Sequence, residues 1–173
     1  MTALLLPPLL LVLACICISD LFYRTIPNRM VLLIVLLGVL QQLGNGHEAV
    51  PDRLIEQLLP ALASGLAVLA VGLLIYLGGR IGAGDIKLLA ALAIWFGSED
   101  TLVFLVATAL AGGALALGLP LLNALERQLC PPMVWLAQRF PTAISVPTTY
   151  DEHRPVGLPY GLAIVTGACI CLL

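Results

Sequence analysis

The chain has 173 residues, of which 61% are hydrophobic and only 10% are charged, and its mean hydropathy is +1.07. Soluble domains carry about 25% charged residues, so this composition excludes an ordinary soluble domain and predicts an integral membrane protein. The net charge of −2 says little about partners, and the sequence has no basic tract that would suggest a nucleic-acid partner. Because a spanning helix needs roughly 20 apolar residues, we expect an all-α, polytopic membrane helix bundle of about six transmembrane helices, forming a single domain.

The predicted helices are apolar runs separated by polar connectors. In chain order their apolar parts cover Ala3–Ile18, Arg29–Leu43, Leu58–Leu77, Asp85–Phe96, Thr101–Leu122 and Gly157–Leu173, and the third helix is expected to start earlier, near Arg53. The first run resembles a signal peptide, but it lacks a basic n-region and is followed by further spans, so we expect it to be retained. Residues 123–156 contain several prolines and form a predicted cytoplasmic loop, with an interfacial helix over Met133–Phe140.

The basic residues predict the orientation of these helices. In the six-helix arrangement, Arg53 is the only basic residue on one side of the membrane. The other side carries Arg24, Arg29, Arg80, Lys87, Arg127, Arg139 and Arg154. Positive charge marks the cytoplasmic side, so the sequence predicts a multi-pass membrane protein with both termini outside the cytoplasm.

A Gly-Ala-Gly-Asp stretch opens the fourth predicted helix. Asp85 ends this stretch, and an ionisable residue at the edge of a membrane helix is costly enough to be a functional candidate. Gly82 and Gly84 permit positive φ and leave the carboxyl group uncovered, so that a peptide could approach it closely. The alternative is a glycine-rich turn in which Asp85 caps the helix.

A second acid, Asp20, comes directly after Ser19, at the end of the first predicted helix. In the six-helix arrangement, Asp20 and Asp85 both lie at the cytoplasmic membrane face. Two carboxyls at one depth suit acid–base peptide hydrolysis, in which one takes a proton from water and the other polarises the scissile carbonyl. Close carboxylates cannot both ionise, so such a pair shares one proton, and its apparent pKa values belong to the pair.

Three stretches together resemble the type IV prepilin peptidase family, whose members are membrane aspartic proteases of the Gly-x-Gly-Asp type. They are Asp20 followed by Arg24-x-Ile26-Pro27-Asn28, then Gly82-x-Gly84-Asp85-x-Lys87, then Leu158-Pro159-Tyr160-Gly161-x-Ala163-Ile164. The resemblance extends from the first to the last predicted helix. It implies a leader peptidase for type IV prepilin-like precursors, acting at the cytoplasmic face of the bacterial cytoplasmic (inner) membrane, with the catalytic pair at Asp20 and Asp85.

The sequence departs from the longer members of that family in one respect. Those members carry paired Cys-x-x-Cys motifs in an N-terminal cytoplasmic region and also N-methylate the new terminus, whereas this sequence contains no Cys-x-x-Cys. It resembles the short kind that serves tight-adherence (Flp) pili. We therefore expect a peptidase without methyltransferase activity, without a metal and without a cofactor, whose partners are a prepilin-like substrate and the lipid bilayer.

Five further residues are candidates for supporting or substrate-binding roles. Lys87 either offsets the negative charge of the pair, holds a substrate carboxylate, or extends to the membrane interface. Arg24 either meets acidic head groups or substrate, or serves the topology alone. Asn28 caps the second helix or bonds near the pair, and we favour capping. Pro159 and Tyr160 either line the site or only pack.

Other functions remain open at this stage. A protease of the presenilin or signal-peptide-peptidase kind places its first Asp deep within a span, beside a tyrosine, whereas Asp20 follows Ser19 at a helix end. A small proton-coupled transporter needs acids that can relay protons within the membrane, and no acid lies at mid-span in the predicted helices. A non-catalytic subunit of a pilus or secretion machine is the third alternative, and the presence of both aspartates favours an active enzyme over it.

Overall fold

The computed structural model describes residues 2–44, 54–79, 81–121 and 159–173, with isolated positions at 124, 128, 131, 134 and 139. Every regular element in these residues is a helix, which confirms the all-α class. In chain order the elements are α1 (Thr2–Tyr23), α2 (Asn28–Gly44), a π-helical turn η1 (Leu54–Leu58), α4 (Leu59–Leu77), α5 (Ala83–Leu117) and α7 (Tyr160–Leu172). Apart from positions 134 and 139, the predicted interfacial helix at Met133–Phe140 lies outside the described residues.

The described helices have the length and polarity of membrane spans. Three apolar stretches are long enough to cross a bilayer: Leu4–Tyr23, Glu56–Leu77 and Ala83–Leu117. The helices α2 and α7 are shorter and also apolar. Large apolar side chains are exposed along the described helices, including Leu66 of α4 at 67% and Leu110 of α5 at 71%. Such exposure is expected where a helix faces lipid rather than water.

Helix α5 joins the predicted fourth and fifth helices across a sharp bend. At the bend Gly97 has φ 77° and ψ −178°, a conformation that favours glycine. Gln42 of α2 lies against this bend, and its Nε2 donates to the carbonyl oxygens of Ile94 and Trp95, at 3.0 Å each. Gln42 thereby provides a donor to backbone carbonyl groups at the end of the helix that precedes the bend.

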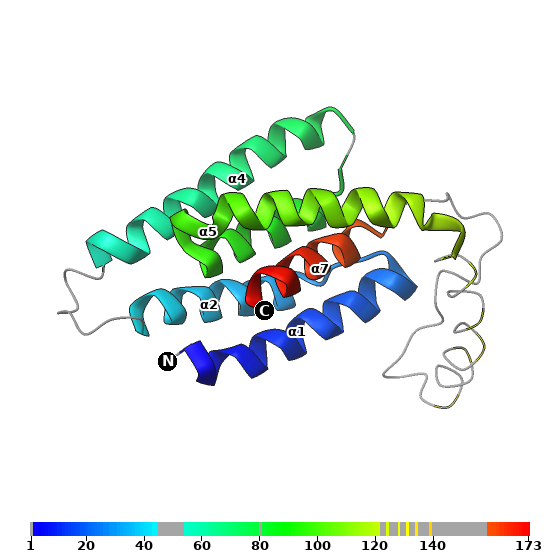
Figure 1. The fold of residues 1–173 in the computed structure, drawn as a ribbon, viewed down its shortest axis with the longest axis horizontal. Helices are drawn as coiled ribbons and strands as arrows, with labels where there is room; N and C mark the ends of the chain where they lie inside the picture. Colours follow the sequence, from blue (N-terminus) through cyan, green and yellow to red (C-terminus); the bar gives the residue numbers. More distant parts are fainter. Residues whose placement is uncertain are drawn as a thin grey trace.

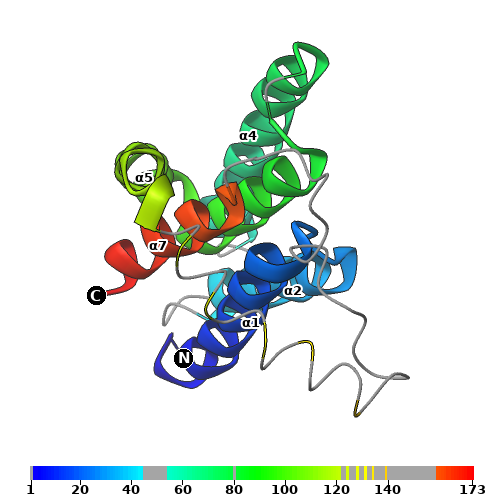
Figure 2. The same cartoon turned by 90° about the vertical axis from the view of Figure 1, so that its right-hand side faces the viewer.

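The other helices pack around α5. Both α2 and α4 lie against it, and α7 packs between α5 and α1. Figure 2 shows α4 on the opposite side of α5 from α1. A buried core of large apolar side chains joins α1, α2, α5 and α7, including Leu13, Ile34, Leu92 and Ile164. The end of α1 and the beginnings of α2, α5 and α7 consequently meet at one end of the bundle (Figure 1).

Candidate active site

Asp20 lies inside α1, one turn before the helix ends at Tyr23. The predicted helix end at Ile18 was therefore wrong. The next residues remain helical because they are apolar and Phe22 is buried, at 6% exposure. The backbone N–H of Arg24 donates to the carbonyl oxygen of Asp20 at 3.1 Å and ends the helix. As a result Asp20 is directed into the bundle and is only 5% exposed.

The first turn of α7 binds the Asp20 carboxyl. The backbone N–H of Leu162 donates to Oδ2 of Asp20 at 3.2 Å. Pro159, which precedes α7 and is fully buried, has no side-chain capping bond to offer. Since the first N–H groups of a helix lack partners within the helix, Asp20 supplies from α1 the acceptor that a capping residue would otherwise provide.

Gly161 allows this close approach of α7 to α1. A Cβ atom at position 161 would lie 2.8 Å from Oδ2 and 2.9 Å from Cγ of Asp20, distances that real Cβ atoms essentially never show. Gly161 is therefore a site residue that the sequence did not single out as a candidate. Its signal was present, because Gly161 follows Pro159 and Tyr160 in the stretch that carried the family resemblance.

Asp85 is the third residue of α5, in the turn where acidic residues are favourable. The backbone of Gly82 hydrogen-bonds its carboxyl group. Gly82 does not use the positive φ that glycine permits, because it is extended at φ −72° and ψ 144°. Glycine is needed here for space, since a Cβ on Gly82 would lie 2.9 Å from Oδ2 of Asp85. A Cβ on Gly84 would lie 3.3 Å from that of Ile26.

Asp20 and Asp85 line one cavity of about 380 Å³ at the end of the bundle where the helix termini meet. We call this cavity the dyad cavity. It is also lined by Arg24, Thr25, Ile26, Asn28, Gly82, Ala83, Gly84, Lys87 and Tyr160. Of the residues that the sequence singled out, only Pro159 is not among its lining residues. Among the described residues, no three His, Cys, Asp or Glu side chains gather as metal ligands would.

The basic residues of the dyad cavity are held in different ways. Lys87 is exposed, and its Nζ donates to Oδ1 of Asn28 at 3.3 Å. This bond joins the beginnings of α5 and α2, so the Asn28 side chain contacts a residue of another helix at the rim of the dyad cavity. Arg24 has a φ of 52°, the only positive φ of a described non-glycine residue. A left-handed conformation costs a residue with a Cβ roughly 1–2 kcal/mol, so the fold holds Arg24 against a backbone preference.

The arrangement provides the groups for hydrolysis by acid–base chemistry. Two carboxyls from different helices share one cavity, so one can accept a proton while the other donates one. Each also meets the first turn of a helix, α7 for Asp20 and α5 for Asp85. Backbone N–H groups and helix dipoles at such ends favour nearby negative charge, which offsets part of the cost of an acid close to the membrane.

Comparison with known proteins gives one match. The type IV leader peptidase family matches residues 8–117, a stretch that includes both aspartates and ends before α7. No curated protein and no solved structure matches the chain significantly. The matched stretch covers more than half of the chain, and the family is the one that the sequence motifs resembled. With its apolar helices and this match, the chain belongs to the type IV leader peptidase family and is a multi-pass membrane protease.

Proposed function

We propose that the chain is an aspartic endopeptidase that cleaves the leader peptide from type IV prepilin-like precursors of the Flp kind. The observation that carries the proposal is the dyad cavity, in which Asp20 and Asp85 meet at one end of a membrane bundle. A carboxyl pair that shares a cavity is the minimum for water activation without a covalent intermediate. Membership of a leader peptidase family supports the choice of substrate.

In the proposed reaction the pair carries one proton. The ionised carboxylate takes a proton from a water molecule, and the oxygen of that water attacks the scissile carbonyl carbon. The protonated carboxyl hydrogen-bonds the carbonyl oxygen and stabilises the negative charge that develops there. When the tetrahedral intermediate collapses, the C–N bond breaks and the leaving amine receives a proton from the carboxyl that took it from water.

The proposed orientation puts the dyad cavity at the cytoplasmic face of the inner membrane. Arg24 and Lys87 line this cavity, and positive charge favours the cytoplasmic side. Both chain ends would then lie outside the cytoplasm. A precursor whose apolar helix lies in the bilayer would bring the end of its leader to this depth, where the two carboxyls are.

The test is cleavage of a prepilin by the purified chain in lipid, with mass spectrometry locating the cut. Asp20→Asn and Asp85→Asn keep the size of each side chain and remove its titration, so both should reduce kcat by at least about 10³-fold. Asp100→Asn is the matched control, because Asp100 is exposed and lies on α5 beyond the Gly97 bend.

A single cut at the leader junction, lost in both variants and kept in the control, supports the proposal. Loss in only one of the variants would contradict the pairing of Asp20 with Asp85 but keep the protease. No cut by the unmodified chain, tried with several precursors, would favour the non-catalytic subunit or the proton-coupled transporter.

A further inference from the structure

Lys87 lines two neighbouring cavities. One is the dyad cavity, and the other is an apolar groove of about 400 Å³ bounded by α2, α4 and α5. Apart from Lys87, every side chain that lines this groove is apolar. They are Val31, Val35, Leu62, Gly65, Leu66, Leu69, Ala90, Ala91 and Ile94. Lys87 is the one described residue that lines both cavities, so the groove lies next to the place where the two carboxyls are.

The groove exists because α2 and α4 both pack on α5 but not against each other over their lengths. Figure 2 shows α4 rising away from α2 on the far side of α5. The floor is made of the small residues Ala90 and Ala91, which keep it flat. On the α4 wall Leu66 is 67% exposed and Leu69 is 38% exposed. Within the described residues, the groove is therefore a lateral opening toward the bilayer.

We infer that this groove seats the apolar membrane segment that follows the scissile bond of the substrate. The inference rests on the proposed function and adds to it a binding site for the substrate. A segment bound there enters sideways from the lipid, and its polar end meets Lys87 at the mouth. From Lys87 to Ile94 the floor extends about 10 Å at 1.5 Å per residue. The groove is thus long enough to contact one face of about seven residues of a helix, beginning close to the cut.

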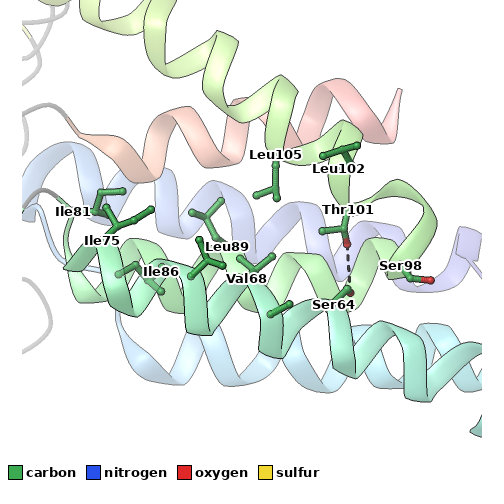
Figure 3. Close-up of a pocket in the computed structure, with 13 residues that line it drawn as sticks. Ser64, Val68, Ile75, Ile81, Ile86, Leu89, Ser98, Thr101, Leu102 and Leu105 are labelled. Carbon is green, nitrogen blue, oxygen red and sulfur yellow. Dashed lines mark hydrogen bonds between the residues drawn. The ribbon is translucent and has the colours of Figure 1, made fainter. Parts of the chain in front are cut away.

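A larger cavity on the other face of α4 is a less suitable binding site for the substrate segment than the groove. It measures about 500 Å³ and lies between α4 and the two limbs of α5 (Figure 3). Its polar contact, from Oγ1 of Thr101 to Oγ of Ser64 at 3.4 Å, lies near the Gly97 bend rather than near the two carboxyls. None of its lining residues also lines the dyad cavity. Ile81 and Ile86 bring this cavity next to the Gly82–Asp85 stretch in the chain, but no described side chain is shared with the dyad cavity as Lys87 is shared by the groove.

Photo-crosslinking tests this inference. A photoreactive amino acid is placed at Leu66 in the groove or, as the matched control, at Val71, which lies on the same helix but lines the larger cavity. Both positions are exposed, at 67% and 58%. Each carrier chain also contains Asp85→Asn, is reconstituted in lipid vesicles and is irradiated with a full-length prepilin. We expect the Leu66 probe to capture precursor residues within about ten positions after the cut, and the Val71 probe to capture mainly lipid.

A kinetic measurement provides a second test. Leu66→Trp fills the groove and should raise KM for the precursor about tenfold, whereas Val71→Trp should leave KM near that of the unmodified chain. Capture of lipid alone at Leu66, equal capture at both positions, or capture of leader residues would overturn the inference. If the chain cleaves the precursor but these results fail, only the groove is wrong. If it cleaves no precursor, the proposed function itself has failed.

Discussion

Replacing Gly161 with alanine tests whether the contact between α7 and Asp20 is needed for activity. The new Cβ would lie 2.8 Å from Oδ2 of Asp20, about 0.6 Å closer than the 3.4 Å at which ordinary contact begins. The carboxyl or α7 must therefore shift, and the hydrogen bond from Leu162, already 3.2 Å long, is weakened or lost. A buried carboxyl deprived of a donor costs about 1–3 kcal/mol. Displacement of a reacting group by up to about 1 Å lowers the rate by about 10²-fold.

The assay is prepilin cleavage by the purified Gly161→Ala chain, measured as kcat and KM alongside the midpoint of thermal unfolding. Gly113→Ala is the matched control, because a Cβ at position 113 would meet no neighbouring group within 4 Å. Alanine in that helix interior should stabilise by up to about 1 kcal/mol and preserve cleavage. We expect kcat to fall for Gly161→Ala while KM changes little. Cleavage at the unmodified rate would refute the argument that α7 positions Asp20.

Three further expectations concern stability and pH. Gln42→Leu removes both hydrogen bonds to the α5 bend and should lower the unfolding free energy by about 1–3 kcal/mol. Gln41→Leu is the control and should not lower it, because the buried Oε1 of Gln41 has no partner among the described residues. Equal losses of unfolding free energy in the two variants would contradict this. At position 24, Arg24→Gly should be about 1 kcal/mol more stable than Arg24→Ala in thermal unfolding, because of its positive φ. Cleavage should show a bell-shaped pH profile, since the proposed pair works with one proton and not with two or none; a flat profile would contradict it.

The sequence was a good guide to the class of the fold and to its helices. Hydropathy alone predicts a helix bundle in lipid, and the third helix, expected to start near Arg53, is observed as the π-helical turn η1 from Leu54 followed by α4 from Leu59. The turn expected after Phe96 is also present, as the bend at Gly97. Hydropathy could not show that Gln42 stabilises this bend from α2, because periodicity describes one helix and not the partners that it meets.

Site residues were predictable from the sequence where the side chain itself is unusual for its position in an apolar helix. Asp85 is an acid at the start of an apolar helix, and Asp20 is an acid next to an apolar helix, so both stand out from the sequence. The importance of Gly161 does not stand out, because it depends on the space that Asp20 occupies. The end of α1 was misplaced for a related reason, since burial of Phe22 continues the helix beyond a charged residue.

The bond between Leu162 and Asp20 has a consequence for the order in which the protein is made. The two residues are separated by 142 positions, so a ribosome completes both aspartates long before it reaches α7. Under the proposed function, a nascent chain that has inserted its earlier helices holds both acids but not the backbone donor that fixes one of them. Proteolytic activity would then arise late in biosynthesis, and a prematurely terminated product lacking α7 would not cleave other membrane proteins.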